Sequence, residues 1–133
     1  MSFDAGVIYA LGELPSAGDY GHAVVIEYIW REDEPLTCGQ YLIASGDTYW
    51  ALYGHLSASS LHIYAVGDRV KRGQLIGWLG AESENGGWPP HLHFQLSRER
   101  PDGHDMPGVV TVAERDQALD IYPDPRAILG ALY

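Results

Sequence analysis

Short apolar runs separated by turn-forming residues make up most of this chain. Residues 5–11 and 23–30 are rich in Val, Ile and Tyr, whereas residues 12–21 between them are rich in Gly, Pro, Ser and Asp. Residues 41–44 and 48–56 flank a Ser-Gly-Asp turn, which is typical of a β-hairpin. Many short strands separated by turns predict an all-β domain, mostly antiparallel.

The remaining segments are less regular. Small residues at 57–60 predict a helical turn, and the repeated glycines of 67–80 predict tight turns that join short strands. Residues 98–108 are a polar loop, residues 109–112 a last short strand, and residues 113–120 a short helix.

The most informative segment is a strand pattern that carries two histidines. Successive side chains of a strand point to opposite faces, so His91 and His93 share one face with Gln95. The apolar residues that alternate with them are expected to face the core: Leu92, Phe94 and Leu96. Two imidazoles side by side on a strand are a credible part of a metal or acid–base site.

A second strand pattern brings in a third histidine. In residues 48–56, strict alternation places Tyr53 on the same face as His55. Tyr53 and Gln95 therefore share faces with histidines and are candidates for lining a groove. Trp88, which precedes two prolines, is a further candidate at the rim of such a groove.

Composition and charge exclude several classes of function. The 133 residues include 18 acidic and 8 basic side chains, which gives a formal net charge of -10. This balance argues against binding to nucleic acid or to an anionic membrane surface. Cys38 is the only cysteine, so neither an internal disulfide nor a thiolate zinc site is expected. Because the amino terminus shows no signal-peptide pattern, we expect a cytoplasmic protein.

Three motifs in order resemble the lysostaphin/LytM-type zinc metallopeptidases, which cut peptide cross-links in bacterial cell walls. These motifs are YGHLS at residues 53–57, VGDRVKRGQLIG at residues 66–77 and PHLHF at residues 90–94. The resemblance covers roughly residues 6–96. It implies a sheet or sandwich of the duplicated hybrid motif type with a central groove, and a single domain over residues 1–133.

A closer resemblance is to the version of this domain found in cytoplasmic fusion proteins, between a kinase-like phosphotransferase and a class III aminotransferase. It rests on LYGHLS at residues 52–57 and ENGGWPP at residues 84–90, among other segments.

The family resemblance implies a role for each of the three histidines. His93 would be a zinc ligand, and His55 and His91 would polarise the attacking water or stabilise the developing oxyanion. A zinc ion lowers the pKa of bound water to about 7, and neighbouring histidines transfer protons. The implied ligand is a peptide or a peptidoglycan-like peptide.

The chain departs from the family in its metal motif. Family enzymes take two more zinc ligands, a His and an Asp four residues later, from a segment upstream of the region that resembles residues 5–7. Asp4 is the only acidic residue there, and it has no His partner. A catalytic zinc site normally has three protein ligands and a water. Zinc is therefore expected only if other ligands complete the site.

Three interpretations stay open. The domain is a degenerate member that serves as a non-catalytic binding or regulatory module, or it is a fragment of an ordinary zinc peptidase. Alternatively the site is rebuilt from the three histidines, or recruits His22 or His104. Loss of an early strand would also leave an unpaired sheet edge, so the sequence predicts self-association.

A carrier domain is a weaker alternative. Residues 67–77 also resemble half of a lipoyl or biotinyl carrier motif, which needs an exposed lysine at a hairpin tip. Lys71, the only lysine, does not lie in such a context. The PHLHF segment favours the peptidase family.

Overall fold

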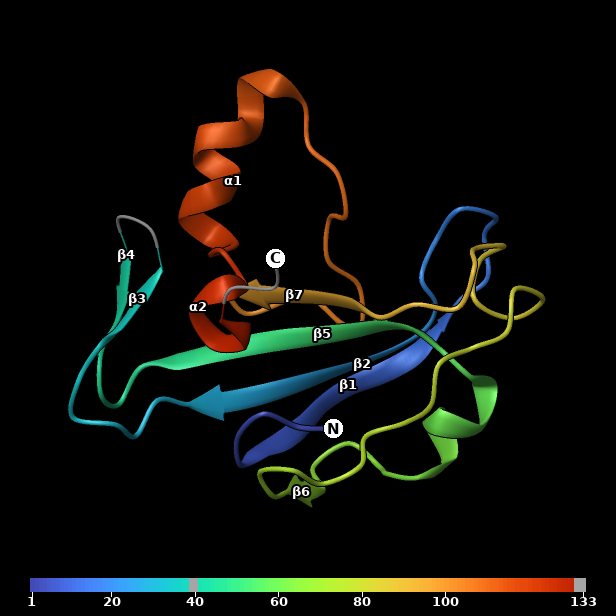
Figure 1. The fold of residues 1–133 in the computed structure, drawn as a ribbon, viewed down its shortest axis with the longest axis horizontal. Helices are drawn as coiled ribbons and strands as arrows, with labels where there is room; N and C mark the ends of the chain where they lie inside the picture. The colour runs from blue at the N-terminus through green and yellow to red at the C-terminus, as the bar shows by residue number, and fades with distance from the viewer. Residues whose placement is uncertain (39–40, 131–133) are drawn as a thin grey trace.

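A single five-stranded antiparallel sheet forms the body of the molecule in the computed structural model, which describes residues 1–38 and 41–130 (Figure 1). The strand order is β6-β1-β2-β5-β7, and every neighbouring pair is antiparallel. The strands are β1 (Gly6–Leu14), β2 (Gly21–Ile29), β5 (Thr48–Leu56), β6 (Arg69–Val70) and β7 (His93–Ser97). This confirms the predicted fold class.

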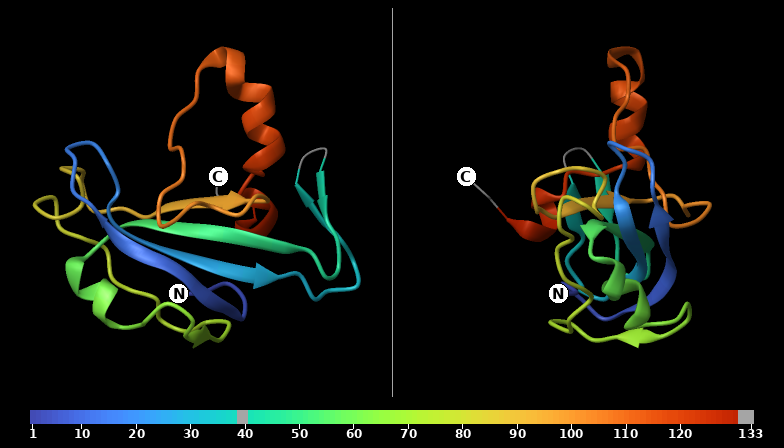
Figure 2. Two further views of the ribbon diagram at one scale, coloured as in Figure 1. Left: turned by 180° about the vertical axis from the view of Figure 1, so that it is seen from behind. Right: turned by 90° about the vertical axis from the view of Figure 1, so that its right-hand side faces the viewer.

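The other elements are short. They are the strands β3 (Leu36–Cys38) and β4 (Tyr41–Ile43), the 3-10 helices η1 (Ala58–His62) and η2 (Val112–Glu114), and the helices α1 (Arg115–Ile121) and α2 (Arg126–Leu129). The helical turn predicted near residue 58 and the helix predicted over 113–120 are confirmed. In Figures 1 and 2, α1 stands away from the sheet. No helix in the described part of the chain is long and apolar enough to cross a membrane.

One predicted strand and one predicted strand pairing are wrong. Residues 109–112 form no strand, because the Thr111 N–H and hydroxyl both donate to the Glu114 carboxylate and start η2 with a capping box. Residues 41–44 do not pair with β5, since β4 pairs with β3. The turn is instead hydrogen-bonded to Trp30, the residue that follows β2: the Gly46 N–H donates to the Trp30 carbonyl, and the Trp30 N–H donates to the Asp47 carbonyl.

The segment predicted to hold several short strands, residues 67–80, contains less sheet than expected. It forms the two-residue strand β6 and one isolated bridge between Leu79 and Leu56. Most of its other residues have no regular secondary structure.

Both faces of the sheet are covered. One face carries the larger core, which includes Ile26, Tyr28, Tyr49 and Leu96. The opposite face carries a smaller cluster, with Val25, Leu52, Tyr20 and Met106 among its members. Burial on two sides explains why β2 and β5 are apolar along nearly their whole length.

The apolar face predicted for the histidine strand is correct only within β7. Leu96 is fully buried, and Phe94 packs against the larger core. Leu92 was expected to join them but is 46% exposed, because it lies before the first residue of β7.

The amino-terminal segment packs on the larger core. The Ser2 N–H donates to the Gln74 carbonyl, and the Phe3 ring lies 4.5 Å from the Tyr28 ring. The Ser2 hydroxyl lies 2.7 Å from the Tyr28 hydroxyl, which lies 2.8 Å from the Tyr53 hydroxyl. This buried chain of hydroxyls is one of the few polar features inside the core.

Candidate functional site

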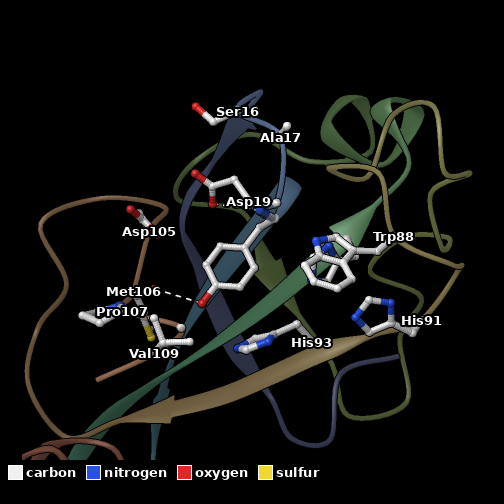
Figure 3. Close-up of a pocket in the computed structure, with 14 residues that line it drawn as sticks. Ser16, Ala17, Asp19, Trp88, His91, His93, Asp105, Met106, Pro107 and Val109 are labelled. Carbon is white, nitrogen blue, oxygen red and sulfur yellow. Dashed lines mark hydrogen bonds between the residues drawn. The ribbon is translucent and has the colours of Figure 1, made fainter. Parts of the chain in front are cut away.

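An open cleft of about 540 Å³ lies at one end of the sheet. Four segments line it: residues 16–20 between β1 and β2, His55 in β5, residues 88–93, and residues 105–109. Figure 3 shows His91, His93 and Trp88 on one side of this cleft and Asp105, Met106 and Pro107 on the opposite side.

An unusual backbone conformation aims His55 into the cleft. Its φ of 59° makes it the only residue other than glycine with a positive φ in the described part of the chain. The His55 N–H donates to the Tyr20 carbonyl, and its own carbonyl accepts from the Gly80 N–H. Alternation is broken at this point, so Leu56 rather than His55 enters the larger core.

The same break corrects the interpretation of Tyr53. This residue was expected to share a face with His55 and to line the groove, but it is 3% exposed and belongs to the larger core. Burial raises the pKa of the Tyr53 hydroxyl, which is hydrogen-bonded to Tyr28. Tyr53 therefore does not line the cleft.

The structure brings the three predicted histidines together. The ring centre of His55 lies 4.3 Å from that of His91 and 6.1 Å from that of His93. His93 lies in β7, opposite Gly54 of β5, and His91 lies two residues before it. Three imidazoles from two neighbouring segments thus meet on one wall.

Each imidazole has one nitrogen against a carbonyl oxygen. The distances are 2.8 Å from His55 Nδ1 to the Asn85 oxygen and 2.7 Å from His91 Nδ1 to the Pro89 oxygen. His93 Nε2 lies 3.0 Å from Gln95 Oε1. A carbonyl oxygen only accepts, so these nitrogens donate. In the neutral rings the lone pairs are left on His55 Nε2, His91 Nε2 and His93 Nδ1.

Gln95 supports His93 from the side. The Gln95 side-chain Nε2 donates to the Pro107 carbonyl at 3.0 Å. This bond fixes Oε1 as the atom that faces His93. Gln95 lines an adjoining pocket, which shares Pro107, Gly108 and Val109 with the histidine cleft, rather than that cleft itself. Burial lowers the pKa of His93; the Gln95 hydrogen bond opposes that effect, and His55 and His91 add to it.

Trp88 lies at the rim, where the sequence predicted it. Its side chain is 45% exposed, and its ring centre is 6.4 Å from both His55 and His91. The other histidines proposed for a rebuilt site lie elsewhere: His22 is buried at the start of β2, and His104 Nε2 lies 3.1 Å from the Glu13 carbonyl oxygen.

Sequence reasoning missed Tyr20, which also lines the cleft. Its ring centre lies 4.7 Å from that of His93, and its hydroxyl donates to the Met106 carbonyl at 3.0 Å. Burial, followed by the charges of Asp105 and Asp19, raises the pKa of Tyr20 to about 12. An aromatic residue between Asp19 and Gly21, in the turn that leads to β2, was the available signal.

The wall formed by residues 105–109 was also missed, because its position depends on long-range contacts. The Tyr9 hydroxyl donates to the Pro101 carbonyl, and His104 contacts the carbonyl of Glu13. These bonds fold the predicted polar loop back over β1.

The sequence profile described as Peptidase family M23 matches residues 1–106. The chain belongs to peptidase family M23. Family members are typically zinc-dependent and act on peptidoglycan peptides.

One curated relative of the M23 domain is the glycyl-glycine endopeptidase ALE-1 of Staphylococcus capitis. It is 43% identical over 54 residues, which are 41% of this chain and 14% of the relative. The chain therefore matches only a small part of that protein's length. No solved structure matches the M23 domain.

The described residues of this M23 domain do not fit a complete zinc site. Among residues 1–38 and 41–130, no group of three or more His, Cys, Asp or Glu side chains is arranged to hold a metal ion. His93 Nδ1 has the lone pair that a ligand needs, but a catalytic zinc ion normally takes three protein ligands. The described residues alone therefore do not complete a catalytic zinc site.

Proposed function

We propose that this M23 domain binds cell-wall-type peptides in the histidine cleft and is a metallopeptidase-type domain whose zinc site the described residues leave incomplete. One observation carries the proposal: the ring nitrogens with lone pairs in His55, His91 and His93 belong to side chains that line one open cleft. Such nitrogens accept hydrogen bonds from peptide N–H groups and from water.

The charge of the cleft supports a peptide ligand. Asp19 and Asp105 line it, and none of the lining side chains in the described structure is Lys or Arg. A cleft of this composition favours a neutral or ammonium-bearing peptide over a phosphate or a nucleic acid.

The chain's own residues suit proton transfer during peptide hydrolysis. Nε2 of His55 or His91 takes the proton of a water that attacks the scissile carbonyl, and the resulting imidazolium returns it to the leaving amine. Tyr20 keeps its proton at neutral pH because its pKa is raised to about 12. That proton is donated to the Met106 carbonyl, so the hydroxyl oxygen is left as a hydrogen-bond acceptor.

A non-catalytic binding module is the second candidate. It is favoured by the lack of a three-donor metal group among the described residues. In that case the same cleft holds peptides without cutting them.

Zinc binding separates the two candidates. We would measure zinc content and affinity of the purified chain, together with His93→Ala and with His62→Ala as control, because His62 is exposed on η1. Stoichiometric sub-micromolar zinc that is lost only in His93→Ala supports the peptidase, and cleavage of a pentaglycine peptide would follow. A folded, zinc-free chain that still binds pentaglycine supports the module.

Peptide binding tests the proposal as a whole. Titration with pentaglycine and with a lysine-containing cell-wall peptide should show binding that is at least tenfold weaker in His91→Ala than in His62→Ala. The absence of binding to either peptide, or equal binding by the two variants, would refute a peptide cleft.

A further proposal concerns the domains that adjoin this one. We infer from residues 84–90 and 52–57 that the domain is of the cytoplasmic type fused to a class III aminotransferase. Sequencing of the surrounding reading frame tests this: an adjoining aminotransferase supports it, and a secreted lysostaphin-type arrangement contradicts it.

A further inference from the structure

Asn85 lies behind the cleft rather than in it. It is the single asparagine of the chain, and it is fully buried in the turn over residues 81–88. Its side-chain Nδ2 donates to the Gly80 carbonyl at 3.1 Å and to the Trp88 carbonyl at 2.7 Å. Its Oδ1 accepts from the Trp88 N–H at 2.9 Å. The amide thus uses both of its donor hydrogens and its acceptor.

The main chain of the same residue holds His55. The Asn85 carbonyl accepts the Nδ1–H of His55 at 2.8 Å, and this bond is buried. One residue therefore fixes both backbone groups of Trp88 and the ring orientation of His55. His55 lies in β5 and Trp88 in the turn, so these two parts of the cleft come from different segments of the chain.

The turn has little room in which to move. The Gly18 N–H donates to the Gly86 carbonyl, and a Cβ atom at Gly86 would lie 2.0 Å from the Asp19 carbonyl oxygen. On another side, a Cβ atom at Gly80 would lie 3.1 Å from the Asn85 Cβ. The Asn85 carbonyl is consequently held at a defined position beside β5.

We propose that Asn85 is a positioning residue for His55. The hydrogen bonds of the Asn85 side chain hold the turn in place and keep the Asn85 carbonyl against His55 Nδ1. The neutral His55 ring therefore carries its proton on Nδ1 and presents Nε2 as the acceptor. Any role of this hydrogen bond in peptide chemistry rests on the proposed function, whereas the hydrogen bond itself is independent of it.

The chemistry of the site selects asparagine. Alanine would leave the buried Gly80 carbonyl and both backbone groups of Trp88 without their partner. Aspartate has the same shape, but it would turn a carboxylate oxygen toward the carbonyls of Gly80 and Trp88, which only accept hydrogen bonds. Neither replacement can make the three side-chain hydrogen bonds of Asn85.

The test reads the tautomer of His55 directly by ¹⁵N NMR of the histidine rings at alkaline pH, where the rings are neutral. The wild-type chain should show His55 protonated at Nδ1. In Asn85→Ala and Asn85→Asp, His55 should shift toward the Nε2–H form that free histidine prefers. Trp88→Ala keeps the backbone groups that Asn85 binds, so it should retain the wild-type tautomer.

A stability control separates positioning from general loosening. Ile26→Val weakens the core away from the cleft and should leave the His55 tautomer unchanged. An Nε2–H tautomer in the wild-type chain overturns the inference, as does an unchanged tautomer in a folded Asn85 variant or the same shift in Ile26→Val. The wild-type spectrum tests the His55–Asn85 hydrogen bond even where the variants fail to fold. A lack of peptidase activity would refute only the proposed enzyme.

Discussion

Tyr53 and His55 are separated by one residue, yet their side chains lie in different environments. The Tyr53 hydroxyl ends a buried chain that runs through Tyr28 to Ser2, whereas His55 faces the cleft. The glycine between them would place a Cβ atom 2.9 Å from the Tyr20 ring, so the chain passes Tyr20 closely at that point. Function and packing are thus separated within three residues.

Tyr53→Phe should destabilise the fold without affecting the cleft. It removes one buried hydrogen bond, while the Tyr28 hydroxyl keeps its contact with Ser2. We expect the free energy of unfolding in urea to fall by about 1 kcal/mol, with pentaglycine binding unchanged. Weaker peptide binding at unchanged stability would contradict the placement of Tyr53 in the core.

Tyr20 should make stability depend on pH in the alkaline range. Its pKa is about 12 in the folded chain, against 10.0 for an unperturbed tyrosine. The folded state therefore holds this proton more tightly, so its stabilising contribution is complete below pH 10 and is lost as the pH rises toward 12. Urea unfolding of the wild-type chain should weaken more steeply over this range than that of Tyr20→Phe. Parallel curves for the two proteins would contradict the assigned environment.

Among the elements, the strands that the alternation predicted are present, and the errors lie where backbone geometry or distant contacts decide. β1, β2 and β5 overlap the predicted apolar runs, since burial follows the sequence pattern directly. The pairing of β4 was missed because the Ser-Gly-Asp turn signal does not reveal that this turn is hydrogen-bonded to Trp30.

The candidate site divides in the same way. His91, His93 and Trp88 were found because they adjoin one another in sequence. The conformation of His55 has no local sequence signal, and it reversed the assignment of Tyr53. Tyr20 and the wall at residues 105–109 join the cleft through contacts between distant segments.

Two adjacent glycines test the close contact between the turn at 81–88 and the loop at 16–20. Gly86 and Gly87 have φ values of 90° and 88°, so alanine is strained at both. Only at Gly86 does a Cβ atom meet another segment, at 2.0 Å from the Asp19 oxygen. We expect Gly86→Ala to lower the free energy of unfolding by about 1–3 kcal/mol more than Gly87→Ala. Equal losses in urea unfolding would show that the two segments do not pack this tightly.

At the scale of the whole molecule, an unpaired sheet edge favours contact between copies, whereas the net charge opposes it. β1 pairs with β6 only at Gly6 and Val7, so most of its outer edge has no strand beside it in the described part of the chain. His104 covers the Glu13 carbonyl on that edge. The formal net charge of -10 opposes contact between copies.

The predicted self-association should therefore depend on salt. Light scattering should show a larger dimer fraction at 0.5 M than at 0.05 M salt, since screening weakens the repulsion between copies. His104→Ala should raise that fraction further, because it uncovers the Glu13 carbonyl. A monomer under all of these conditions would contradict self-association through the edge.

The left-handed backbone at His55 also limits which sequences the fold can explore. Glycine tolerates a φ of 59° best, and asparagine and aspartate tolerate it better than β-branched residues do. A lineage that no longer needs the imidazole is expected to drift to glycine or asparagine at this position while it keeps the sheet. Homologues with either residue would then mark the point at which selection for chemistry ended and selection for shape continued.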